Sequence, residues 1–161
     1  MTVSIRPATA EDRTFVISSW LDSQRTSYSA GLIAMEDWYK VQWPQYEKII
    51  DRTDMRTLVA YEKRDPTFLY GFIVADPTEQ RVEEKDGAVR WWPALVVYVF
   101  VKQNYRRTGI ARRLFDAVEI DPEKPFLYAS NTQQASRLAS KVPLAKFHPL
   151  AVRFPKERKA A

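Results

Sequence analysis

An apolar segment that runs directly into a basic turn constrains the fold of this chain most strongly. Residues 91–101 (WWPALVVYVFV) carry no charge, and eleven residues are too few to cross a membrane as a helix. A valine-rich segment of this length, apolar at nearly every position, is typical of a strand covered on both faces. We therefore expect a sheet with this strand at its centre and other elements packed on each side.

The residue periodicity elsewhere predicts alternating strands and helices. Further strands are expected at 3–6, 56–62, 68–76, 126–130 and 147–154, and helices at 9–21, 35–50, 109–118 and 135–142. Thr9 and Asp12 have capping-box spacing, residues 22–31 are polar and irregular, and Pro44 is expected to interrupt the second helix. Asp86-Gly87 predicts a small projecting hairpin within 77–90.

The resulting order, β-α-α-β-β-β-α-β-α-β, predicts an α/β (α+β) fold. We expect a mixed, mostly antiparallel central sheet flanked by helices, in one domain over residues 1–161 with a basic tail at 155–161.

Two scarce residue types exclude several kinds of site. The chain has no cysteine and one histidine, His148, which excludes disulfides, cysteine nucleophiles and multi-histidine metal centres, so no metal is expected. The first residues lack the basic-then-apolar pattern of a secretion signal. We expect a cytoplasmic protein without a membrane partner.

The basic turn that follows the apolar strand predicts a phosphate site. The net charge is +5, and residues 102–113 alone hold five positive charges and no acid. Such a patch points to a nucleotide-like cofactor or to a nucleic acid. A strand that leads into a helix leaves backbone N–H groups pointing outward, and Gly109 and Ala111 let a diphosphate approach them closely.

The pattern Arg106-x-x-Gly109-x-Ala111 narrows this choice, since neither the P-loop pattern nor G-x-G-x-x-G occurs in the chain. It resembles the [RQ]-x-x-G-x-[GA] signature of the GNAT superfamily of N-acetyltransferases, and the element order agrees over about residues 2–154. The resemblance implies acetyl-CoA, or another acyl-CoA, as cofactor. It also implies direct transfer of the acetyl group to a primary amine.

The resemblance further implies which residues bind the cofactor. Val99 and Val101 would offer backbone groups to the pantetheine arm, and the N–H of Val101 would stabilise the oxyanion. The phosphates would be lined by Arg106, Arg107, Thr108, Gly109, Ile110, Ala111 and Arg112. Asn131 would face the pantetheine, or would instead cap the following helix.

The usual catalytic side chains of the family are missing. Leu95 stands where many members have a glutamate base, and Leu138 where many have a tyrosine acid. Three substitutes are considered: Tyr98 acting through a water, and Tyr128 and Ser130 as proton donors to the thiolate. Tyr98 has a core role as its alternative. His148 would line the acceptor site, or would have only a structural role.

Residues 20–28 should form the acceptor pocket, and their single acid and single arginine favour a small-molecule or weakly charged amine. One alternative is a catalytically degenerate domain that binds CoA or a protein partner. Another is nucleic-acid binding through the basic patch and tail, although a short patch around Gly-x-Ala suits a compact diphosphate better. A homodimer is left open beside a monomer.

Overall fold

The computed structural model describes residues 1–25, 29–83, 85–130 and 132–152. Its strands are β1 (Val3–Pro7), β2 (Arg56–Glu62), β3 (Asp65–Asp76), β4 (Gln80–Glu83), β5 (Val89–Trp92), β6 (Ala94–Val101), β7 (Phe126–Tyr128) and β8 (Ala145–Phe147). The α-helices are α1 (Arg13–Arg25), α2 (Met35–Ile50), α3 (Ile110–Ala117) and α4 (Gln133–Ala139). Short 3-10 turns are η1 (Ala10–Asp12), η2 (Ser29–Leu32) and η3 (Gln103–Tyr105).

The main sheet has the order β1-β2-β3-β6-β7-β8. Neighbours from β1 to β6 are antiparallel, whereas β6–β7 and β7–β8 are parallel. This confirms the predicted mixed, mostly antiparallel sheet with β6 near its centre. Side chains alternate between the two faces of β6, so each face needs its own cover.

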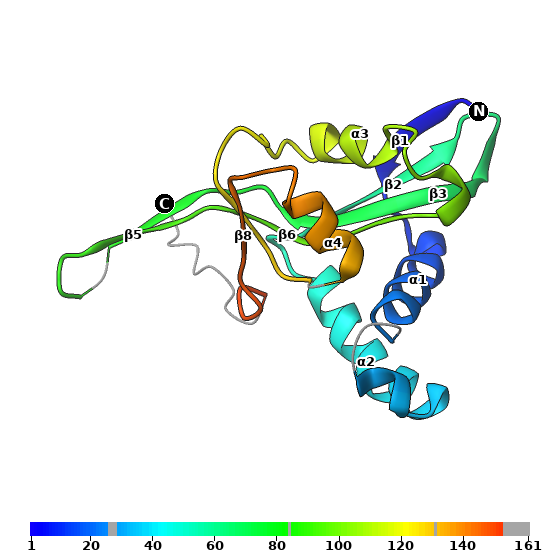
Figure 1. Cartoon of the computed structure of the whole chain (residues 1–161), viewed down its shortest axis with the longest axis horizontal. Helices are drawn as coiled ribbons and strands as arrows, with labels where there is room; N and C mark the ends of the chain where they lie inside the picture. The colour runs from blue at the N-terminus through cyan, green and yellow to red at the C-terminus, as the bar shows by residue number, and fades with distance from the viewer. Residues whose placement is uncertain (26–28, 84, 131, 153–161) are drawn as a thin grey trace.

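Helices supply that cover on both faces (Figure 1). On one face, α1 and α2 pack over a core that includes Trp20, Phe72 and Val97. On the other face, α3 buries Ile110 and Leu114 against β-strand residues such as Ile73. No helix among the described residues is long and apolar enough to span a membrane.

The predicted strand 91–101 is wrong at its start. Trp91 and Trp92 belong to β5, and β6 begins at Ala94. Pro93 separates them because proline cannot donate a ladder hydrogen bond. Consequently Trp91 is 46% exposed on the projecting β4–β5 arm, where Gly87 has the positive φ expected of the hairpin turn (Figure 1).

Two helix predictions need correction. Residues 22–25 continue α1 instead of starting a loop, because their side chains find partners on neighbouring elements: Tyr39 donates to the Asp22 carboxylate at 2.6 Å. Pro44 lies inside α2 without ending it. The capping box of Thr9 and Asp12 is confirmed, and Asp12 also pairs with Arg6.

The closing strand was also misplaced. It spans Ala145–Phe147 rather than 147–154, and the backbone N–H of His148 forms its last bond to the Tyr128 carbonyl at 3.0 Å. Pro149 follows and has no N–H to continue the ladder. The strand predicted at 126–130 ends at Tyr128, and the basic tail lies outside the described residues.

Candidate functional site

Strands β6 and β7 separate halfway along β6. Their parallel ladder pairs residues 94–96 with 126–128, and one further bond joins the N–H of Ala129 to the Val96 carbonyl at 3.1 Å. Beyond that point, the rest of β6 pairs with β3 alone among the described residues. The second edge of β6 is therefore open from residue 97 to residue 101.

A β-bulge sits where the two strands separate. Tyr98 pairs with Val74, but Val96 pairs with the next residue of β3, Ala75, so Val97 is the extra residue. A bulge bends its strand and re-aims the groups that follow it. The bend thus coincides with the start of the open edge.

The open edge carries unpaired backbone groups. The N–H of Lys102 donates to the Tyr70 carbonyl at 2.8 Å, which turns the polar groups of every second residue toward β3. The polar groups of Val99 and Val101 consequently face the opening. Arg106 Nε donates to the Val101 carbonyl at 3.0 Å. The N–H groups of Val99 and Val101 remain on the open edge.

The turn after β6 exposes the beginning of α3. Gly109 caps this helix with φ of 83°, and a Cβ built there would meet no atom within 4 Å. The first helical bond runs from the Arg113 N–H to the Gly109 carbonyl at 3.1 Å. The N–H groups of residues 110–112 precede it, so the helix itself gives them no acceptor. Such a start attracts anions.

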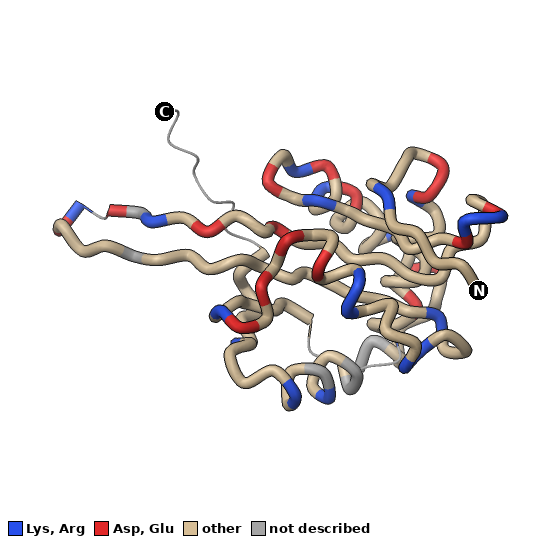
Figure 2. Tube along the Cα trace, turned by 90° about the horizontal axis from the view of Figure 1, so that it is seen from above, with Lys and Arg blue, Asp and Glu red and all other residues tan. Residues whose placement is uncertain are grey.

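The five basic side chains of residues 102–113 differ in what they contact. Lys102 Nζ lies 4.4 Å from the centre of the Phe68 ring, Arg106 and Arg113 donate to the Val101 and Val3 carbonyls, and Arg112 pairs with Asp116 at 3.8 Å. All four arginines are exposed. Figure 2 shows basic and acidic residues interspersed along the trace. This arrangement suits a compact anion better than a long polyanion.

The structure does not bring the three predicted catalytic residues together. Tyr98 is 5% exposed and stacks on Trp20 at 5.4 Å, and burial raises the pKa of its hydroxyl. These contacts support the core role for Tyr98. Tyr128 packs on the opposite face of the sheet, against Phe147 at 5.4 Å.

Ser130 is buried just past β7, at the base of the opening. Its hydroxyl donates to the Val97 carbonyl at 2.7 Å and accepts from Gln24 Nε2 at 3.3 Å. Its only hydrogen is therefore already used. Nδ1 of His148 is buried and has no hydrogen-bond partner among the described residues.

The structure also shows where Leu95 and Leu138 lie, the two residues that stand in place of the usual catalytic side chains. Leu95 is buried in the core below α1 and α2, and Leu138 belongs to α4. Asn131 lies outside the described residues. No group of three or more metal-ligating side chains occurs within the described part of the chain.

Sequence reasoning placed Gln24 within the predicted acceptor pocket at 20–28 but missed Tyr46 and the contact between Gln24 and Ser130. Gln24 links Ser130 to the Tyr46 hydroxyl, and Trp20 of the same helix stacks on Tyr98. A signal existed, because Gln24 follows Trp20 by four residues and hence shares its helix face. The polar character of 22–31 hid it.

Comparison with known proteins reveals similarity at the level of structure. No protein-family model and no curated protein matches the sequence. An aminoglycoside antibiotic 6'-N-acetyltransferase from Acinetobacter baumannii is 19% identical, with TM-score 0.52 over 99% of this chain and 95% of that one. A Pyrococcus furiosus protein assigned as an acetyl transferase is 14% identical, with TM-score 0.61 over 99% and 96%.

A third solved structure contains a bound analog. It is AAC(6')-Iy in complex with the bisubstrate analog CoA-S-monomethyl-acetylneamine, 16% identical, with TM-score 0.50 over 100% of this chain and 96% of that one. Identities this low concern the fold, and the mixed sheet with its helices on both faces agrees with them. The chain has the fold of the GNAT acetyltransferases, as the sequence predicted.

Proposed function

We propose that this protein is an acetyl-CoA-dependent N-acetyltransferase that modifies a primary amine. The observation that carries the proposal is the continuity of the open β6 edge with the exposed start of α3, through the left-handed turn at Gly109. Structural neighbours named as acetyltransferases support it, one of them bound to a CoA conjugate.

The described residues fit the cofactor. The open space at Gly109 and the free N–H groups of residues 110–112 would hold the diphosphate, flanked by Arg106, Arg107, Thr108 and Arg112. The backbones of Val99 and Val101 would hold the pantetheine arm, while the role of Asn131 stays a prediction. Acetyl-CoA supplies an activated thioester, so that the acetyl group moves to nitrogen and CoA leaves as the thiol.

Catalysis would then rest on backbone donors and positioning. The N–H of Val101, or that of Val99 on the same edge, would donate to the acyl carbonyl oxygen and polarise it. With Leu95 in the position of the base, no carboxylate is assigned to remove the amine proton. Holding the two reactants together supplies much of the acceleration without one.

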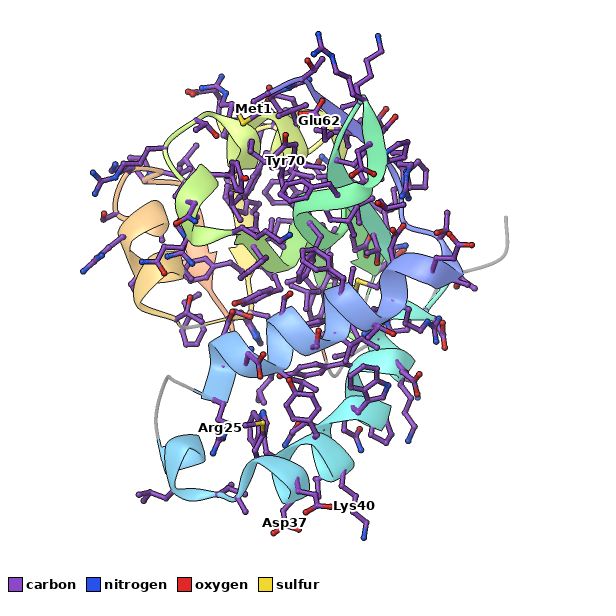
Figure 3. All side chains as sticks on the ribbon, turned by 90° about the vertical axis from the view of Figure 1, so that its right-hand side faces the viewer. Met1, Arg25, Asp37, Lys40, Glu62 and Tyr70 are labelled. Atoms are coloured by element: carbon purple, nitrogen blue, oxygen red, sulfur yellow. The ribbon has the colours of Figure 1, made fainter. Side chains whose placement is uncertain are left out.

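The acceptor is proposed to be a small or weakly charged amine. The two charged groups at the end of α1 are used within the protein: Asp22 binds Tyr39, and Arg25 donates to the Ile33 carbonyl at 3.2 Å. Figure 3 shows Asp37 and Lys40 on the outer side of α2. A polycationic acceptor would therefore meet few free acids here. A cytoplasmic location and a homodimer stay predictions.

A second candidate is a domain that binds CoA without turnover. The buried hydroxyl of Tyr98 and the leucine at position 95 favour it, since neither serves as a proton-transfer group. CoA binding together with transfer no faster than the buffer blank, across a broad amine panel, would select this candidate.

The decisive test compares two matched glycine variants by calorimetry with acetyl-CoA. Gly109→Glu and Gly87→Glu both replace a glycine with positive φ and open space around it, so their backbone strain is similar. Only Gly109→Glu places a carboxylate at the proposed diphosphate site. We expect binding to be lost in Gly109→Glu and kept in Gly87→Glu. Equal affinities in the two variants would contradict the proposal.

A further inference from the structure

The C-terminal part of α1 contacts both strands at the opening. Trp20 stacks on Tyr98 of β6 at 5.4 Å, and Gln24, one turn later, donates to Ser130 beyond β7 at 3.3 Å. Two residues on one face of this helix thus contact both sides of the opening. The base of the proposed acyl site is built by α1 as well as by the sheet.

The hydrogen bonds of this cluster all run in one direction. Tyr46 donates to Gln24 Oε1, Gln24 Nε2 donates to Ser130 Oγ, and Ser130 donates to the Val97 carbonyl at 2.7 Å. Turning the Gln24 amide around would draw the Ser130 hydrogen away and leave that carbonyl without this donor. The observed orientation satisfies more buried groups, which is the requirement for a polar network in a core.

This arrangement leaves one acceptor site on Ser130. A serine hydroxyl has one hydrogen and two lone pairs. The hydrogen goes to Val97, and Gln24 occupies one lone pair. The second lone pair is not used by any hydrogen bond of the described residues, and Ser130 is 7% exposed at the base of the opening.

We infer that Ser130 Oγ accepts a hydrogen bond from an N–H of the attacking amine, and that Gln24 is a positioning residue that fixes the direction of this lone pair. The inference rests on the proposed function. The amine nitrogen keeps its own lone pair for the acyl carbon, and Ser130 neither gains nor loses a proton. This role differs from donation to the thiolate, which would require the hydrogen now held by Val97.

The test separates amine binding from cofactor binding. Four probe amines, methylamine, ethanolamine, benzylamine and tyramine, are assayed with acetyl-CoA, and CoA affinity is measured by calorimetry. Ser130→Ala should lower kcat/KM for the amine about tenfold, the effect of one lost hydrogen bond, with CoA affinity within about twofold. Ser130→Thr, which keeps the hydroxyl, should retain most of the rate.

Two further variants test the positioning role. Gln24→Leu should cost more than Tyr46→Phe, because it removes the donor that, together with the Val97 carbonyl, fixes the orientation of the Ser130 hydroxyl. Tyr46→Phe leaves the bond between Gln24 and Ser130 in place, so a loss of about threefold or less is expected. Ser18→Ala is the matched control on the same helix, since within the described part of the chain the Ser18 hydroxyl bonds only the Thr14 and Phe15 carbonyls of α1 itself.

A readout without turnover completes the design. In the dead-end complex with CoA and benzylamine, the side-chain NH₂ signals of Gln24 should shift in NMR spectra of the wild type and not of Ser130→Ala. Amine kcat/KM in Ser130→Ala within twofold of wild type, or an equal loss of CoA affinity, would overturn the inference alone. Wild-type protein that binds no CoA, or acetylates none of the amines, would overturn the proposed transferase together with it.

Discussion

Gly71 offers the sharpest test of how the open edge is built. It pairs with Val101 at the end of β6, and a Cβ at this position would lie 2.2 Å from the Phe100 carbonyl oxygen. Real Cβ atoms do not approach backbone oxygens so closely, so β3 and β6 must move apart in Gly71→Ala. Overpacking costs about 1–3 kcal/mol in free energy of unfolding. Because the obstacle here is rigid backbone, we expect a cost of about 3 kcal/mol for this variant. For a chain of this size that corresponds to a fall in Tm of about 6–12 °C.

The control is Gly31→Ala, whose Cβ would meet its nearest neighbour at an ordinary 3.5 Å without a positive φ. Calorimetric melting should show a Tm close to wild type for Gly31→Ala and the large fall for Gly71→Ala. Since the displaced residues adjoin Val101, folded Gly71→Ala should also bind acetyl-CoA more weakly. A Gly71→Ala variant that melts like Gly31→Ala would refute the reasoning.

Two other contacts give predictions of their own. The Tyr70 hydroxyl, beside Glu62 in Figure 3, lowers the pKa of that carboxyl to about 2, so Tyr70→Phe should raise it in an NMR titration. Because the pKa of Glu62 is lower in the folded protein than in the unfolded chain, its carboxylate stabilises the fold at a pH above the unfolded pKa, and this effect is lost as the pH falls toward about 2. The Tm values of wild type and Tyr70→Phe should therefore differ least near pH 2. An unchanged Glu62 titration would contradict this. Arg107→Glu should weaken acetyl-CoA binding without changing Tm. Arg113→Ala should lower Tm, because it loses the bond to the Val3 carbonyl, and should leave acetyl-CoA binding intact. The reverse pattern in calorimetry would be inconsistent with the site.

The fold was readable from local signals that agree with one another. The Thr9–Asp12 capping box, the turn at Gly87 and the helix start at Gly109 all depend on neighbours in sequence. The apolar run of β6 predicted a central strand because burial on both faces needs apolar residues at every position.

The errors arose where distant residues decide the structure. Residues 22–25 read as a loop because polar side chains compete with the helical backbone, and only Tyr39 and other residues far along the chain satisfy them. Pro44 predicted a break in the helix because the sequence shows the local penalty of proline but not the tertiary packing that offsets it. In the structure Trp38 bonds the Leu21 carbonyl, and α2 continues through Pro44. The Gln24–Ser130 contact joins residues 106 positions apart, so no local pattern announces it.

The most direct test of the account is an NMR titration of backbone amides with acetyl-CoA. The largest shifts are expected at residues 109–112 and at Val99 and Val101, where the open edge of β6 meets the start of α3. Unchanged signals there would contradict the account. So would shifts confined to the separate hollow of about 470 Å³ near Thr9, Ile50 and Leu58.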